Sequence, residues 1–403
     1  MHEETDGIEH ARSSSVIVVL AAVVGVLAGA TSELHLGPAS ASAVITATAA
    51  GSCIALAPML VGSGHLVPTP AVLFVALAFG RAVFAPSSDG LQNVAAYAIL
   101  LLVPAFVARR VDPIGAERAL RWFTVAGLAA TALFAAQHVL GFLTDGVRSY
   151  ALAALPLLAA AVALRSGPLP LRAAPLVVTL GIVASLSRTA SVVAILMLVA
   201  LVTRRPRGRR TGLAVVAVSV ATAGFIALYS FVPSFAARFS AGDNASVGGV
   251  TINTSGRAKI WAAVADHARS APLLGHGPGS AAQLVTDTFI EVRQPHNDWL
   301  RLLHDTGWIG VSLFALAMVT LLVRIGSAAR ATDRPVHWAA LSALLALLAT
   351  AVTDNTLIYP FAIGSTAVLV GLSLGTAPRR GTAPADLPVP SASSTNHTEG
   401  TRP

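Results

Sequence analysis

Residues 308–326 read WIGVSLFALAMVTLLVRIG, a run in which Arg324 is the only charged side chain. A bilayer core about 30 Å thick is crossed by roughly 20 mainly apolar residues in a helix, so this run predicts a membrane span. The segment just before it, QPHNDWLRLLHDTG (294–307), carries two histidines, two aspartates and an asparagine. A polar segment at the mouth of an apolar span is the first candidate for a functional site.

The composition extends this interpretation to the whole chain. Hydrophobic residues make up 55%, charged residues 11%, and the mean hydropathy is +0.72, whereas soluble domains carry about 25% charged residues. We expect an all-α integral membrane protein with about twelve transmembrane helices, and counts of eleven or ten stay open because 170–186 is a short run. The apolar runs are 14–32, 40–62, 66–84, 91–108, 120–142, 148–165, 170–186, 189–203, 211–232, 308–326, 336–353 and 356–375.

One long polar interval interrupts the series of runs and contains its own helix signals. A loop of this length is usually functional. Within it, 243–255 reads as flexible, and helices are expected from about Gly256 to Ala268 and from Asn297 to Asp305. The expected segments are a cytoplasmic N-terminus (1–13), transmembrane helices 1–9 (14–232), a large helical extracytoplasmic loop (233–306), transmembrane helices 10–12 (307–376) and a disordered cytoplasmic tail (377–403).

The arginines predict the orientation, because cytoplasmic loops carry the excess of basic residues. With the N-terminus in the cytoplasm, the loops after even-numbered helices and the chain after the last helix hold sixteen arginines, and the short loops of the outer side hold three. The three in the short outer loops are Arg81, Arg148 and Arg188. The cytoplasmic ones are Arg109, Arg110, Arg118, Arg121, Arg165, Arg172, Arg204, Arg205, Arg207, Arg209, Arg210, Arg324, Arg330, Arg334, Arg379 and Arg380.

This distribution also accounts for the net charge of +8 without a nucleic-acid partner. The basic cluster 204–210 is better explained as a cytoplasmic topology anchor. Cys53 is the only cysteine, so one chain forms no internal disulfide and no thiolate metal site. The N-terminus is acidic rather than basic, which favours a retained first helix over a cleaved signal peptide.

Arg188 stands at the outer junction of two spans, in the stretch SLSRTASVVAI (185–195). A charge at the edge of an apolar segment is costly and suggests function. The alternative is that its long side chain snorkels to the headgroups. Ser187 and other hydroxyl residues beside it favour an anion site.

Arg257 lies in the first turn of the expected helix that starts near Gly256. A cation at that end opposes the helix dipole unless an anion is present. A phosphate there would receive both backbone N–H groups and the guanidinium. Lys259 adds a second cation. The alternative is a solvated basic helix face.

His296 is followed by Asn297 and Asp298, which suit the cap and the first turn of the next helix. Capping does not explain His296, whose titration near neutral pH makes it a candidate general base. The alternative is a structural histidine. Activity that depends on such a base should decline below about pH 6.5, where a free imidazole becomes protonated.

Three further polar residues are weaker candidates. His304 follows His296 at a spacing of two helical turns, which suggests a supporting position on the same face. A metal site built from these two histidines with Asp298 and Asp305 fits no recognised ligand spacing. His276 lies among glycines that lack the spacing of a phosphate-binding loop. Asp354 is expected at an outer junction, where it would pair with an arginine.

Three motifs, in this order along the chain, resemble the superfamily of bacterial O-antigen ligases and polymerases. SLSRTASVVAI (185–195) is similar to a Ser-x-Ser-Arg segment that opens a span. GRAKIWAAVADHARSAPLLGHGPGS (256–280) is similar to an Arg-x-x-(Ile/Leu)-Trp helix followed by a glycine-rich loop. HNDWLRLLHDTGWIG (296–310) fits a His-(Asn/Ser/Gln)-x9-Gly-x-x-Gly pattern.

The resemblance implies a glycosyltransferase of the cytoplasmic membrane that uses no cofactor and no metal. Such a protein transfers a glycan from undecaprenyl diphosphate to a hydroxyl of a lipid, protein or glycan acceptor. The family pattern assigns the diphosphate to Arg188 and Arg257 and the base to His296. Ser187, Lys259, Asn297, Asp298 and His304 are the expected supporting residues.

Two other classes of function remain open. A multi-span transporter of an anionic or lipid-linked substrate would suit twelve spans, but transporters often show two related halves, and no internal repeat is evident. A catalytically silent assembly partner is disfavoured by the intact set of two arginines and one histidine. The sequence does not distinguish a ligase from a polymerase.

Overall fold

The protein is described from a computed structural model that covers five stretches of the chain. These are residues 66–140, 147–164, 168–203, 257–289 and 292–378, together with residue 230 and two short hairpins. The predicted run 14–32 lies outside the described residues, as do 40–62 apart from Ser40, 211–232 apart from residue 230, and the predicted disordered tail from 379 onward.

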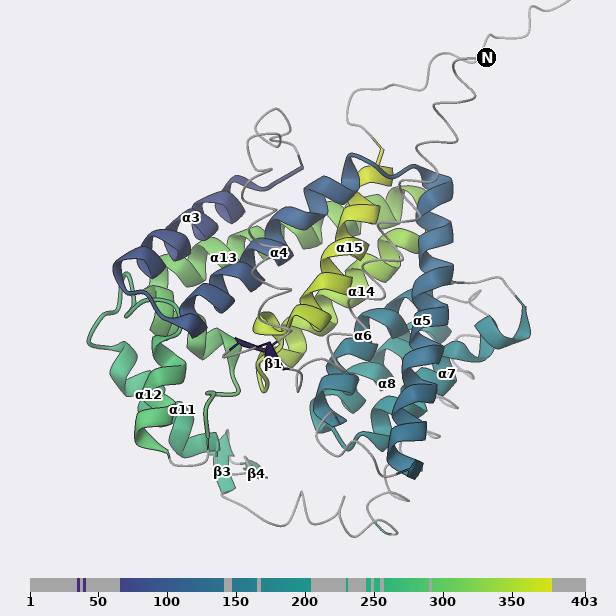
Figure 1. The fold of residues 1–403 in the computed structure, drawn as a ribbon. Helices are drawn as coiled ribbons and strands as arrows, with labels where there is room; N and C mark the ends of the chain where they lie inside the picture. The colour runs from purple at the N-terminus through teal and green to yellow at the C-terminus, as the bar shows by residue number, and fades with distance from the viewer. Residues whose placement is uncertain are drawn as a thin grey trace, which may run out of the picture.

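The described chain is predominantly helical, and the helices form one bundle (Figure 1). In Figure 1, α15 runs beside α4 through the middle, α5 to α8 lie on one side, and α3, α13, α11 and α12 lie on the other. The bounds are α3 (Thr69–Phe84), α4 (Ser88–Ala108), α5 (Pro113–Leu140), α6 (Val147–Ala163), α7 (Leu169–Ala184), α8 (Arg188–Thr203), α11 (Arg257–Ala268), α12 (Ser280–Thr288), α13 (Asp298–Thr332), α14 (Pro335–Thr350), the 3-10 turn η2 (Thr356–Ile358) and α15 (Pro360–Thr376).

Three described helices are long and apolar enough to cross a membrane: α4, the part of α5 from Pro113 to Gln137, and α13. Shorter apolar helices accompany them, namely α3, α6, α7, α8, α14 and α15. Each apolar run predicted within the described residues coincides with one of these helices. On α13, Leu316, Val319 and Val323 each expose more than half of their surface, as a lipid-facing side requires.

Small residues allow the central helices to approach closely. A side-chain carbon added at Gly371 of α15 would lie 2.6 Å from the Val107 Cβ and 2.7 Å from the Pro104 carbonyl oxygen of α4. Glycine at such a contact is typical of membrane helix pairs, where close backbone packing replaces the hydrophobic effect. On the other side, Phe74 of α3 stacks edge-on against Phe314 of α13, with ring centroids 5.3 Å apart.

The long helix α13 contains a break at Gly307, where φ is +64°. The loop 271–279 packs into this break. The Trp308 N–H donates to the Pro272 carbonyl (2.8 Å), and the His276 N–H donates to the His304 carbonyl (2.9 Å). The expected helix from Asn297 and the apolar run from 308 are therefore two helical parts joined at a glycine.

Two short antiparallel hairpins stand beside the helices. The pairs are β1 (His35–Leu36) with β2 (Ala39–Ser40), and β3 (Asn244–Val247) with β4 (Val250–Asn253). The second pair corrects the interpretation of 243–255 as flexible. Val247, Val250 and Ile252 favour strand conformation.

Candidate active site

The turn Thr353–Asn355, between α14 and η2, is the meeting point of the three sequence motifs. The Thr189 hydroxyl, at the start of α8, lies 2.6 Å from the Thr353 hydroxyl. The Arg257 guanidinium, at the start of α11, donates to the Thr353 carbonyl. The His296 ring faces the side chains of Asp354 and Asn355. Segments separated by 164, 96 and 59 positions thus converge on one turn.

Arg188 and Arg257 occupy equivalent local positions, because each is the first residue of its helix. The chain reaches Arg188 through a tight turn in which Leu186 has a φ of +58° and the Ser187 N–H donates to the Ser185 hydroxyl (3.3 Å). Both arginines are partly buried. Each helix start therefore places a guanidinium at the positive end of a helix dipole, an arrangement suited to an anion.

His296 has an unusual backbone conformation, with a φ of +52°. Its N–H donates to the Asn355 Oδ1 (3.0 Å), and the preceding Pro295 carbonyl accepts a hydrogen bond from the Trp261 indole N–H (2.8 Å). A non-glycine residue at positive φ persists only when its surroundings fix it, and such residues cluster at functional sites. Here α11 and the Thr353–Asn355 turn both fix the chain at 295–296.

Two neighbours of the His296 Nδ1 favour opposite tautomers of the ring. The Asn355 Nδ2 lies 3.1 Å away and donates to an unprotonated Nδ1. The Asp354 Oδ1 lies 3.6 Å away and attracts a protonated Nδ1. The amide orientation is fixed, because the Asn355 Oδ1 accepts hydrogen bonds from both the His296 N–H and Arg301. For Nε2 to act as a base, the ring must carry its proton on Nδ1, and this is the tautomer that Asp354 favours.

Asp354 is buried, and burial by itself raises the pKa of its carboxyl. The contact with His296, the hydrogen bond from the Asn355 N–H and the charges of His296 and Arg257 outweigh burial and hold the pKa below its usual range. An ionised carboxylate therefore lies beside the His296 ring at neutral pH.

Behind His296, a buried ion pair fixes the start of α13. The Arg301 guanidinium donates to the Asp298 Oδ1 (2.7 Å) and to the Gln294 Oε1 (3.0 Å). The second Asp298 oxygen accepts the Leu357 N–H (2.7 Å). Both charged side chains are wholly buried. The pair therefore ties the His296 segment to the chain beyond Asn355.

The supporting residues are distributed differently from the prediction. Asn297 caps α13, since its Oδ1 accepts the Leu300 N–H (3.0 Å). Lys259 is exposed on α11. His304 does not join His296: it contacts His267 of α11, Ser280 and Asp305. The two-turn spacing was misleading because His296 precedes the helix and has a non-helical backbone.

Residues 173–315 match the family model described as O-antigen ligase. The matched segment contains all three motifs, and the resemblance to this superfamily is confirmed. No curated protein matches the chain. Arg188, Arg257 and His296 lie inside the matched segment, whereas Asp354 and Asn355 lie beyond its end. The described structure thus supplies neighbours that the domain match does not include.

Sequence reasoning overlooked Arg301 and Asn355, and it expected an arginine rather than His296 as the main neighbour of Asp354. The available signal was the polar triplet Thr353–Asn355 inside an apolar C-terminal region. Polar residues within membrane-embedded segments usually face a partner or a site. The sequence alone does not identify that partner.

Proposed function

We propose that the chain transfers a glycan from undecaprenyl diphosphate to an acceptor hydroxyl on the outer face of the cytoplasmic membrane. The observation that carries this proposal is the convergence of the three motifs on the Thr353–Asn355 turn. An anion site and a titratable ring that share one turn can act on the same substrate, as an O-antigen ligase-like reaction requires.

Arg188 and Arg257 hold the diphosphate in this proposal, with Ser187 and Lys259 in support. Each guanidinium starts a helix, so its charge adds to the positive end of the helix dipole. Guanidiniums at a low-dielectric boundary neutralise the leaving group, and no bound cation is needed at this position.

His296 removes the proton from the acceptor hydroxyl as the bond from the acceptor oxygen to the anomeric carbon forms. The bond between that carbon and the diphosphate oxygen breaks, and undecaprenyl diphosphate leaves with the electron pair. The proton rests on the His296 Nε2 and then passes to water. The ionised Asp354 stabilises the imidazolium that forms, because its carboxylate faces Nδ1.

The topology in this proposal is the one that the arginines predict. About twelve spans place both termini in the cytoplasm and residues 233–306 outside, with the catalytic loop facing the acceptor. A contact between two segments assigned to the outer side supports it: Arg81, near the end of α3, donates to the Gly275 carbonyl at 2.7 Å.

A polymerase would use the same donor and the same residues and would differ in its acceptor, another lipid-linked glycan. The two activities separate when the products of purified protein are analysed with each acceptor. Growth of the glycan chain on the lipid carrier identifies a polymerase, and attachment to a new lipid or protein identifies a ligase.

The proposal is tested by complementing a strain that lacks the gene and analysing its surface glycan. Arg188→Ala and Arg257→Ala should lose transfer by at least about 100-fold while the proteins still insert. Arg269→Ala is the matched control, because Arg269 is exposed on the segment after α11 and forms an ion pair with the exposed Asp266 at 3.1 Å. Full complementation by Arg257→Ala, or substrate flux without a covalent product, would contradict the proposal.

A further inference from the structure

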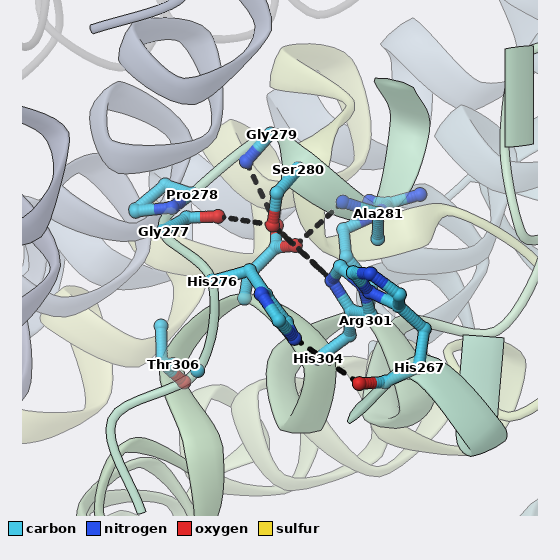
Figure 2. A network of polar contacts seen from close by, with 12 residues as sticks. His267, His276, Gly277, Pro278, Gly279, Ser280, Ala281, Arg301, His304 and Thr306 are labelled. Atoms are coloured by element: carbon cyan, nitrogen blue, oxygen red, sulfur yellow. Dashed lines mark hydrogen bonds and ion pairs between the residues drawn. The ribbon is translucent and has the colours of Figure 1, made fainter. Parts of the chain in front are cut away.

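Three histidines from three separate segments form a cluster on the outer side of α13. They are His267 at the end of α11, His276 in the loop 271–279 and His304 in α13. One ring nitrogen of each lies within 4.8 Å of the others, and no other group of three such ligands occurs among the described residues. Figure 2 shows the three rings beside one another, below Ser280.

The orientation of the His304 ring is fixed by polar groups beside its Nδ1, on the side away from His267. Its Nδ1 lies 3.2 Å from both the Asp305 Oδ1 and the Ser280 hydroxyl. Asp305 is itself held by N–H groups of Gly279 and Ala281, each at 2.8 Å. A proton on Nδ1 leaves the lone pair of Nε2 free, and Nε2 points at the His267 Nδ1 2.9 Å away. A carboxylate behind a histidine ligand is the usual support of a metal site.

The rings of His267 and His276 form the more exposed part of the cluster. His267 is exposed and His276 is half-buried, so a hydrated cation can reach them.

A simpler account is that the rings only stack and hydrogen-bond to one another. The ring centroids of His267 and His276 are 4.2 Å apart, and the His276 Nε2 lies 3.1 Å from the His267 carbonyl. Stacking alone does not require a buried carboxylate with all its oxygens anchored behind the third ring. That feature, together with the convergence of three nitrogens, favours a ligand.

We propose that His267, His276 and His304 bind one divalent cation of the zinc class, with the fourth position open to water. Zinc accepts imidazole nitrogen at about 2.0–2.1 Å in a tetrahedral arrangement, which separates the ligand atoms by roughly 3.4 Å. The His267 Nδ1 and the His304 Nε2 lie 2.9 Å apart, and all three ligand nitrogens lie within 4.8 Å of one another, so small ring rotations suffice. The cation fastens α11 and the loop to α13 and takes no part in the transfer steps.

The test uses the full-length, tag-free protein in lipid nanodiscs, stripped with a chelator and titrated with Zn²⁺. We expect one equivalent to bind and the melting temperature to rise with zinc concentration, because the cation binds the folded state. Co²⁺ in its place should give the visible absorption of a tetrahedral site. No saturable binding, or no stabilisation, would overturn the proposal.

Variants identify the ligands, since the chain has 11 histidines in all. His267→Gln and His276→Gln should each weaken zinc binding at least tenfold, and Arg269→Ala, beside the cluster, should leave it unchanged. His267 and His276 are not wholly buried, so these variants should fold, as the melting temperature of the zinc-free proteins will report. Equal zinc binding by both variants and the wild type would overturn the assignment. The readouts are zinc content and melting temperature, so neither result bears on the glycan-transfer proposal, which is tested separately by complementation.

Discussion

At the scale of single residues, His296 is the side chain whose position is most strongly determined by its neighbours. Its φ is positive, its N–H donates to the Asn355 side-chain oxygen, and its ring lies beside Asp354. In the proposed reaction Asp354 selects the tautomer with a free Nε2, against the amide of Asn355. The role of Asp354 can therefore be tested apart from the presence of the histidine.

Asp354→Asn should lower kcat for transfer by about 10- to 100-fold, because a neutral amide stabilises the imidazolium less than a carboxylate does. KM for the lipid donor should change little. The measurement is steady-state kinetics with purified protein, and Asp287→Asn, at an exposed position on α12, is the matched control. An unchanged kcat would show that Asp354 does not act through His296.

The pH dependence separates the ring from the carboxylate. Activity should fall as the pH is lowered, because a general base acts only in its unprotonated form. The pKa of Asp354 lies below its usual range, so its contribution to stability is complete above the unfolded carboxyl pKa of about 3.9 and is lost only at lower pH. Between pH 7 and 5 we expect kcat to fall while the contribution of Asp354 to stability stays constant. The difference in melting temperature between the wild type and Asp354→Asn should stay constant over this pH range. A difference that shrinks in parallel with kcat would contradict this.

At the scale of secondary-structure elements, the start of α13 depends on a buried ion pair and its break depends on a glycine. Asp298 and Arg301 join the helix start to the chain beyond Asn355. Gly307 lets the loop 271–279 pack into the helix. The first arrangement positions His296, and the second positions the histidine cluster.

Arg301→Met should destabilise the protein by about 3–5 kcal/mol, because it leaves the Asp298 carboxylate buried without its partner. The double variant with Asp298→Leu should recover part of that loss, since no uncompensated charge remains. Thermal unfolding in one detergent compares the three proteins. If Asp298→Leu further destabilises the Arg301→Met protein, as an independent core substitution would, the stabilities of the two residues are not coupled.

Gly307→Ala should lower stability by about 1–3 kcal/mol from backbone strain alone, since φ is +64°. The added carbon would also lie 2.3 Å from the Leu273 carbonyl oxygen, so the loop has to move. Gly364→Ala in α15 is the matched control, because nothing lies within 4 Å of its added carbon. The melting temperatures of the two variants should differ clearly, and equal values would argue against a packed break.

Much of the element level was predictable from sequence. Apolar runs predicted the described apolar helices, three of which are long enough to cross a membrane, and Asn297 was correctly expected to cap its helix. The predicted common face of His296 and His304 was wrong, because helical spacing applies only inside a helix. The hairpin at 244–253 was missed because its strands are too short for an alternating pattern to stand out.

At the scale of the whole molecule, the candidate site is a product of packing between distant segments. The Thr353–Asn355 turn collects contacts from 59, 96 and 164 positions away. Local sequence patterns indicate which residues carry polar or charged groups, but they do not indicate which of these residues contact one another. The contacts of Asn355 and Arg301 were therefore not predictable from the sequence. The same reason hid the histidine cluster, whose members come from α11, a loop and α13.

The orientation of the molecule is a further prediction at this scale. In a Cys53→Ser background, Arg269→Cys should react with a membrane-impermeant maleimide in intact cells, because the loop is proposed to face outward. Arg110→Cys, in a loop assigned to the cytoplasm, should react only after the membrane is permeabilised. Both side chains are exposed in the structure, so a lack of labelling reports the membrane and not burial. The reverse pattern would invert the topology.

The most direct measurement is glycan transfer by purified His296→Ala in nanodiscs, supplied with a polyprenyl-diphosphate glycan and an acceptor. The wild-type protein should form the glycosylated acceptor and release polyprenyl diphosphate in equal amounts. His296→Ala should still bind the donor through Arg188 and Arg257, while transfer falls by about 100- to 10,000-fold, the usual contribution of a general base. Transfer at the wild-type rate by His296→Ala would contradict the account.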